Sequence, residues 1–209
     1  MPSAESVTLY HGTSTLFLDS IVASGLGGSG GTGGKSLLES WGVFDLMNDL
    51  ASERSLWGQR GVPYALAVMA SQSKANLNFQ HGHTYLSPSK LTARRYARSN
   101  AYGSEILSEA ANALINLREG GADCTALLAK YPAIAEIMCK RYKPILISLP
   151  GALSYPLQTE HGEDPRREVQ ALLEGLAEDG SGADTLLLQS NFRLLECVPV
   201  DRLLIEEID

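Results

Sequence analysis

Cysteine is scarce in this chain, and the few thiols it has are far apart. Cys124, Cys139 and Cys197 form no Cys-x-x-Cys pair, which excludes the usual zinc ribbons, redox pairs and disulfide frameworks. We expect all three to be thiols of the core. His81 and His83 could place two imidazoles on one side of an extended segment, but no third ligand lies near them, so we predict no metal site.

Long apolar runs are also missing. None approaches the roughly 20 residues that cross a bilayer, and residues 1–6 contain no basic cluster followed by an apolar stretch. A membrane-embedded chain is therefore excluded, and no secretory signal is visible. With 44% apolar and 20% charged residues, the composition predicts a folded protein of the cytoplasm with no membrane partner.

Positive charge is in short supply as well. The chain has 17 Lys and Arg against 24 Asp and Glu, which gives a net charge of −7. Nucleic acid is therefore an unlikely partner, because binding to it depends on neutralising phosphates, and protein or small-molecule substrates are favoured. One basic cluster departs from this balance, and two interpretations of it stay open, a solvated helix face or a contact to nucleotide phosphates. The cluster consists of Lys90, Arg94, Arg95 and Arg98.

Glycine, in contrast, is abundant, and much of it falls in residues 25–35. We expect this segment to be a flexible loop that contributes nothing to the core. It contains Gly-x-Gly-x-x-Gly, but it follows a helical pattern rather than a strand, so it does not predict a dinucleotide-binding turn.

The order of predicted elements indicates the fold class. Strands are expected near both ends of the chain and helices in its middle, which favours one α+β domain over residues 1–209 with a split or mixed β-sheet. Residues 105–140 match a helical lobe or insertion, where we would search for contacts to a target. The expected strands are 7–10, 84–87, 145–149, 185–189, 192–198 and 203–208. The expected helices are 15–24, 36–56, one capped by Ser87 with Pro88 in its first turn, 105–117, and 122–139 interrupted at Pro132.

Three aromatic and imidazole side chains suggest a ligand site. His11 precedes Gly12 at a predicted strand end, where a ligand could approach the main chain closely. Tyr85 at a strand end and Tyr96 on the next helix could converge into a slot for a flat, positively charged heterocycle such as the nicotinamide of NAD. The alternative, from the residues alone, is that both tyrosines belong to the core and that His11 is an ordinary buried histidine.

Two segments that contain these residues resemble known motifs. Leu9-Tyr-His-Gly-Thr-Ser with Ile21-Val-Ala-Ser-Gly-Leu, and Thr84-Tyr-Leu-Ser-Pro-Ser with Ala93-Arg-Arg-Tyr-Ala, resemble the first two motifs of ADP-ribosyltransferases of the diphtheria-toxin and poly(ADP-ribose) polymerase type. The likeness covers residues 7–26 and 84–98 well, the last fifty loosely, and 100–140 not at all.

The resemblance implies a role for each motif residue. His11 would bond the adenosine ribose of NAD, the Gly12 main chain the nicotinamide carboxamide, and Ser87 its amide, while Tyr85 and Tyr96 would enclose the nicotinamide ring. Thr13 belongs to the same predicted NAD-binding set.

A carboxylate at the start of a late strand normally completes such a site, and the sequence departs from that pattern. The resemblance places Asn191 there, and an amide can bond a ribose hydroxyl but cannot act as a base. Glu168 is the competing candidate, either at the start of a strand or on a solvated helix face, and Glu196 is a third.

These resemblances imply an enzyme that uses NAD as co-substrate, without a metal, and transfers one ADP-ribose to a side chain of a target protein. Such an enzyme fits a bacterial toxin or an effector delivered into a host cell. Two alternatives stay open. One is an RNA 2′-phosphotransferase of the same fold, and the other is a catalytically inactive module that binds NAD or ADP-ribose.

Overall fold

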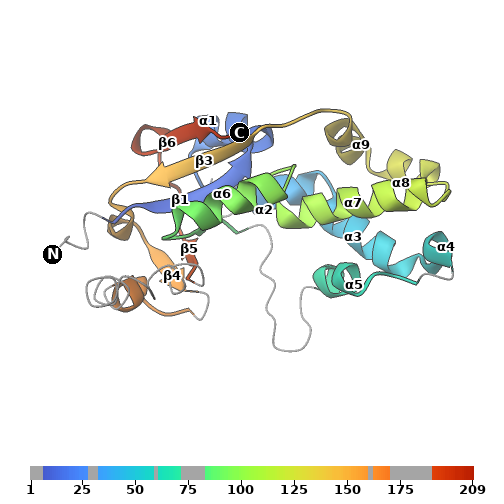
Figure 1. The fold of residues 1–209 in the computed structure, drawn as a ribbon, viewed down its shortest axis with the longest axis horizontal. Helices are drawn as coiled ribbons and strands as arrows, with labels where there is room; N and C mark the ends of the chain where they lie inside the picture. The colour runs from blue at the N-terminus through green and yellow to red at the C-terminus, as the bar shows by residue number, and fades with distance from the viewer. Residues whose placement is uncertain (1–6, 28–32, 59–60, 72–82, 160–161, 170–189) are drawn as a thin grey trace. The chain divides into compact units, whose positions relative to one another are not determined.

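The computed structural model describes residues 7–27, 33–58, 61–71, 83–159, 162–169 and 190–209. The chain divides into two compact units (Figure 1). The first unit consists of residues 1–34, 83–103 and 143–209, and the second of residues 35–82 and 104–142. Among the described residues the strands lie in the first unit and the second unit is helical, so the α+β class is confirmed. The expected strand 185–189 lies outside the described residues.

The first sheet has the order β1-β3-β6, and both of its strand pairs are antiparallel. Its strands are β1 Leu9–Ser14, β3 Pro144–Leu149 and β6 Leu204–Glu207. The prediction for β3 is confirmed. The prediction that the first strand ends before His11 is wrong, because β1 continues to Ser14 in register with β3, and His11 lies inside the strand opposite Ile147.

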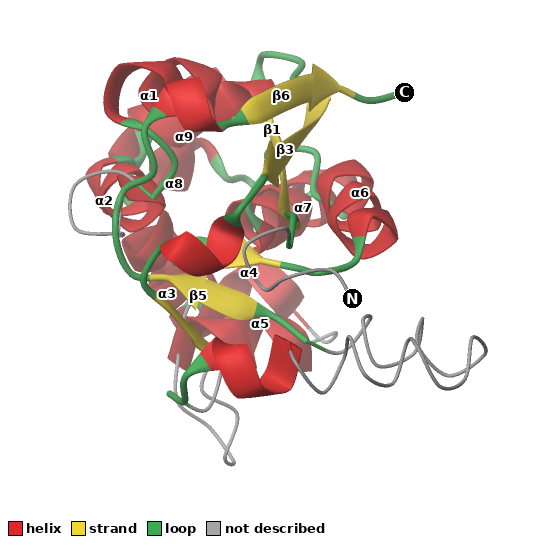
Figure 2. Ribbon diagram, turned by 90° about the vertical axis from the view of Figure 1, so that its left-hand side faces the viewer, coloured by secondary structure: helices red, strands yellow, loops and turns green. Residues whose placement is uncertain are grey.

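The second sheet, also in the first unit, has the order β2-β5-β4. Its strands are β2 Tyr85–Leu86, β5 Phe192–Leu194 and β4 Leu157–Thr159. Figure 2 shows the two sheets as separate groups of arrows. Every strand pair among the described residues is antiparallel, whereas the sequence analysis allowed a mixed sheet with parallel pairs as well. One face of the second sheet belongs to the core, since Leu86, Phe192 and Leu194 are fully buried.

The helices of the first unit flank these sheets. They include the 3-10 helices η2 Thr15–Phe17, η5 Ala152–Ser154 and η6 Val200–Arg202, and the α-helices α1 Leu18–Ser24 and α6 Lys90–Ser99. Gly25 ends α1, as predicted, with φ 83° and its N–H donated to the carbonyl of Ile21. The prediction that residues 25–35 contribute nothing to the core is wrong at Leu26, which is 2% exposed and pairs with Val198. Residues 28–32 of that segment lie outside the described part.

Helix α6 begins two residues later than the sequence predicts. Ser89, not Ser87, is its N-cap, and its hydroxyl accepts the N–H of Thr92 at 3.1 Å. The Ser87 hydroxyl instead accepts the N–H of Ser89 at 3.2 Å. Pro88 therefore lies in the turn before the helix. Its lack of an N–H costs no helical hydrogen bond at that position.

The second unit is a group of short helices. In the described part they are α2 Gly33–Ser40, whose first two residues belong to the first unit, α3 Val43–Ser52, α4 Arg54–Trp57, α5 Tyr64–Ser71, α7 Glu105–Glu119, α8 Thr125–Lys130 and α9 Pro132–Met138. The prediction of a single helix over residues 36–56 is wrong, because Gly42 adopts a left-handed conformation that separates α2 from α3. The predicted interruption at Pro132 is confirmed. The predicted lobe 105–140 thus forms one part of a larger helical unit.

The cysteines differ from the expectation of three core thiols. Cys124 is buried, whereas Cys139 is exposed and Cys197 is half-buried. The thiol of Cys197 donates a hydrogen bond to the carbonyl of Ser24 at 2.7 Å. Among the helices that the structure describes, none combines the length and apolar character needed to cross a membrane.

Candidate functional site

Both sheets of the first unit meet at one pair of residues. The N–H of Tyr10 donates to the carbonyl of Ser87 at 2.8 Å, and the N–H of Ser87 donates back to the carbonyl of Tyr10 at 2.7 Å. These bonds use the edge of β1 that faces away from β3. The two motifs that the sequence singled out are therefore neighbours in space, and we call the point where Tyr10 of β1 meets Ser87 after β2 the junction.

Gly12 lies two residues further along this edge. Main-chain groups alternate between the two sides of a strand, so the N–H and C=O of Gly12 point to the same side as those of Tyr10. A Cβ on Gly12 would lie 2.0 Å from the carbonyl oxygen of Ala93 and 3.0 Å from the nitrogen of Ala97, both on α6. Glycine is therefore needed for the close packing of α6, a reason that sequence reasoning did not identify.

His11 connects the two motifs through its side chain. Its Nδ1 lies 2.8 Å from the carbonyl oxygen of Tyr85, 74 residues away. A carbonyl only accepts, so Nδ1 carries the proton and Nε2 is left as an acceptor. Burial lowers the pKa of His11, and the bond to Tyr85 opposes this with a smaller effect. His11 is therefore neutral near pH 7 and presents an acceptor nitrogen.

This pKa shift makes stability depend on pH. In the unfolded chain His11 gains a proton near pH 6.5, whereas the folded chain resists protonation to a lower pH. The stabilisation is fully present above pH 6.5 and is lost as the pH falls toward the folded pKa. We expect the unfolding free energy, measured in urea between pH 7.5 and 5, to fall less steeply in His11→Gln than in the wild type. Equal slopes would contradict this assignment.

The two tyrosines of the predicted slot keep accessible surface. Tyr85 on β2 is half-buried, and Tyr96 on α6 is 37% exposed. Tyr96 is in the same turn as Ala93 and Ala97, which contact Gly12. The alternative that both rings are ordinary core residues therefore loses support, and the strand and helix that carry them both adjoin β1.

The hydroxyls of Thr13 and Ser87 are less accessible. Thr13 is buried and donates its hydroxyl to the carbonyl of Gly103 at 3.0 Å, which fixes the turn after α6 against β1. Gly103 needs a positive φ of 72° there, and a Cβ would meet the nitrogen of Ser14. Ser87 is buried as well, and its accepting bond to Ser89 leaves the hydroxyl proton able to donate.

We call the place where the resemblance expects a carboxylate the third position, and the register of the second sheet puts one candidate for it at the junction. Tyr85 pairs with Arg193 and Leu86 with Phe192, so the next position along puts Asn191 opposite Ser87. Asn191 is half-buried there. Glu168 lies instead in a helical stretch at 165–169, which is the helical alternative left open by the sequence, and Glu196 is exposed beyond the end of β5.

The basic cluster of α6 is partly engaged by a carboxylate. Lys90 and Arg94 contact Glu206 of β6 at 3.2 and 2.9 Å, and these cations lower the pKa of Glu206. Arg95 and Arg98 are exposed on the same helix. For Lys90 and Arg94 this geometry favours the solvated helix face over nucleotide phosphates, since Glu206 already neutralises part of their charge.

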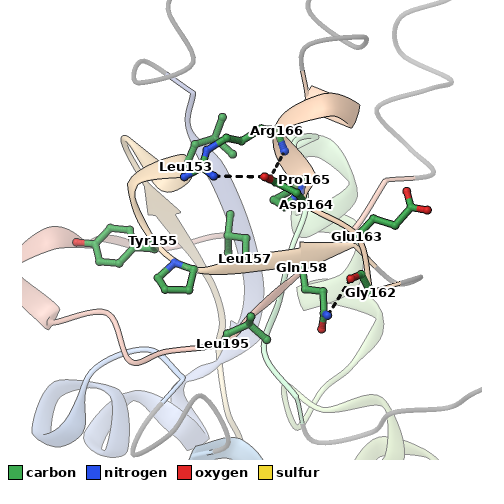
Figure 3. A pocket seen from close by; sticks show the side chains of 11 residues that line it. Leu153, Tyr155, Leu157, Gln158, Gly162, Glu163, Asp164, Pro165, Arg166 and Leu195 are labelled. Atoms are coloured by element: carbon green, nitrogen blue, oxygen red, sulfur yellow. Dashed lines mark hydrogen bonds and ion pairs between the residues drawn. The ribbon is translucent and has the colours of Figure 1, made fainter.

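A hollow of about 230 Å³ lies along β4 (Figure 3). Its wall includes the ion pair of Asp164 with Arg166 at 3.3 Å and the bond from Gln158 to the carbonyl of Gly162 at 3.0 Å. None of the residues that the sequence predicted for catalysis or NAD binding contributes to this wall.

Comparisons of the chain with family models, curated proteins and solved structures gave no match. Over the described ranges, no group of three or more His, Cys, Asp or Glu side chains is arranged to hold a metal ion. The functional argument therefore depends on the geometry of the junction itself.

Proposed function

We propose that this protein is an NAD-dependent mono-ADP-ribosyltransferase that modifies a side chain of a target protein and releases nicotinamide. The observation that supports this most is the 2.8 Å bond from His11 to the carbonyl of Tyr85, beside the bridge between Tyr10 and Ser87. It brings together the two segments that resemble the NAD-binding motifs of ADP-ribosyltransferases. The two antiparallel sheets joined at this bridge would correspond to the split sheet of that fold.

Each candidate residue at or near the junction then has a chemical role. The Nε2 of His11 would accept a hydrogen bond from a ribose hydroxyl. The N–H and C=O of Gly12, on the edge of β1 that faces away from β3, would bond the nicotinamide carboxamide. Tyr85 and Tyr96 would hold the cationic ring between aromatic faces. Fixing the leaving group in this way lowers the barrier to breaking the bond between nicotinamide and ribose.

Asn191 would limit the rate of this reaction. Cleavage of the glycosidic bond passes through a state with positive charge on the ribose, which a carboxylate stabilises strongly and an amide only through its dipole. Without a carboxylate to activate the hydroxyl of an attached ADP-ribose, the enzyme would add one unit rather than a polymer. The proposal therefore predicts slow, single transfers.

A comparison of two variants tests which residue fills the third position. Asn191→Ala should lower the rate of nicotinamide release about tenfold, the effect of losing one hydrogen bond of about 1.4 kcal/mol. Glu168→Ala, in the helical stretch 165–169, should leave the rate unchanged. The rates are measured with NAD at saturation. The opposite ranking would assign the position to Glu168.

Transfer itself is tested with labelled NAD and a cell lysate. The protein should label particular lysate proteins, and mass spectrometry should find single ADP-ribose groups on their side chains. If a 2′-phosphorylated RNA loses its phosphate to NAD while no protein is labelled, the phosphotransferase alternative replaces the proposal. If NAD binds but is never cleaved, the protein is a binding module.

A further inference from the structure

Arg193 occupies a position in the second sheet that the sequence motifs did not single out. It pairs with Tyr85 across β2 and β5 and with Gln158 across β4 and β5. Residues directly opposite in an antiparallel sheet extend their side chains to the same face. Arg193 is thus on the face of Tyr85, and residue alternation adds Asn191 to that face. We call this side of the second sheet, which carries Tyr85, Arg193 and Asn191, the junction face.

Burial supports this division of the sheet into two faces. The other face carries Leu86, Phe192 and Leu194, all fully buried. On the junction face, Tyr85 and Arg193 are only half-buried. A half-buried arginine therefore stands beside one of the two predicted ring-binding tyrosines, and two residues from the candidate third position.

We infer that Arg193 binds the diphosphate of the dinucleotide, an inference that rests on the proposed function. Side chains of directly opposite residues start about 5 Å apart, so the guanidinium and the Tyr85 ring share one neighbourhood. A guanidinium repels the cationic nicotinamide ring and attracts oxygen anions, for which its planar donor fork is well suited. In NAD the nearest anionic group to that ring is the diphosphate, one ribose away.

Because Arg193 is positively charged, we expect it to act in the binding of NAD rather than in the chemical step. A fixed cation does not stabilise positive charge developing on the ribose, so its contribution falls on ground-state affinity. Removing it should therefore raise the KM for NAD and leave kcat close to the wild-type value.

The experiment measures equilibrium binding of NAD, ADP, adenosine and inorganic pyrophosphate to the full chain. Arg193→Gln should weaken NAD, ADP and pyrophosphate about tenfold, the effect of one charge-assisted hydrogen bond, and leave adenosine unchanged. Arg193→Lys, which keeps the charge but not the fork, should recover part of the loss. Arg202→Gln is the matched control, because Arg202 is an exposed arginine of η6 whose ion pair is with the adjacent Asp201.

The outcomes separate this inference from the proposed function. Equal weakening of ADP and adenosine, or no weakening of either, would overturn the role of Arg193 even if NAD is cleaved. Pyrophosphate binding that depends on Arg193 in a protein that does not cleave NAD would support the anion site while the transferase proposal fails. If the wild type binds neither NAD nor pyrophosphate, both are wrong.

Discussion

Tyr85→Ala should lower nicotinamide release from NAD about 100-fold, the size of effect that follows when the leaving group is no longer held in position. Tyr85 is half-buried on the short strand β2, and its carbonyl holds His11. The substitution removes the ring but keeps the main chain, so the bond to His11 and the pairing with Arg193 should persist. The measurement is the steady-state rate of nicotinamide release, together with the affinity for NAD.

Two variants control for this result. Tyr85→Phe keeps the ring face and should retain most of the rate, because stacking does not need the phenol hydroxyl. Tyr64→Ala, at a tyrosine that is 78% exposed in the second unit, should have no effect. A rate for Tyr85→Ala within about twofold of the wild type would show that the ring does not hold nicotinamide.

Gly12→Ala should destabilise the folded protein by about 3 kcal/mol or more, which is at the upper end for overpacking of a close contact. The added methyl would lie 2.0 Å from the carbonyl oxygen of Ala93, a main-chain atom of α6. Neither β1 nor α6 can move without breaking bonds of its own, so the helix that carries Tyr96 would shift. We expect a lower midpoint of urea unfolding.

Gly162→Ala is the control for this prediction within the first unit. Gly162 has φ 86°, and a Cβ there would meet only Gln158, at 3.4 Å or beyond. Its cost should be that of a left-handed alanine, about 1 kcal/mol. A similar loss in both variants would mean that the contact of Gly12 with α6 is not what makes glycine necessary.

Local patterns in the sequence predicted much of the first unit. The apolar, β-branched run of β3 and the glycine stop of α1 depend on neighbouring residues, so the expected elements agree with the observed ones. The extent of β1 was not predictable in this way. Its second half is a strand because it pairs with β3, 130 or more residues away, and no local pattern at His11 reveals that partner.

The helical unit shows a different limit of sequence analysis. The apolar spacing of residues 36–56 fits one helix, but Gly42 takes a left-handed conformation and separates α2 from α3. Glycine is compatible with both outcomes, and tertiary packing decides between them. Ser87 and Ser89 posed the same problem, since both are good caps and only the path of the chain after β2 selects Ser89.

The candidate site was predictable where it depends on motifs and unpredictable where it depends on register. His11, Tyr85 and Tyr96 came from the sequence. Arg193 did not, because its place beside Tyr85 follows from the pairing of β2 with β5, two strands about 100 residues apart. A basic residue within an otherwise apolar strand was the only signal for it.

Release of nicotinamide from NAD by the purified full chain tests the central claim most directly. The account predicts slow release in the wild type, loss in Tyr85→Ala, and an unchanged rate in Tyr64→Ala. No release from NAD, with or without a lysate as a source of acceptor proteins, would contradict the account.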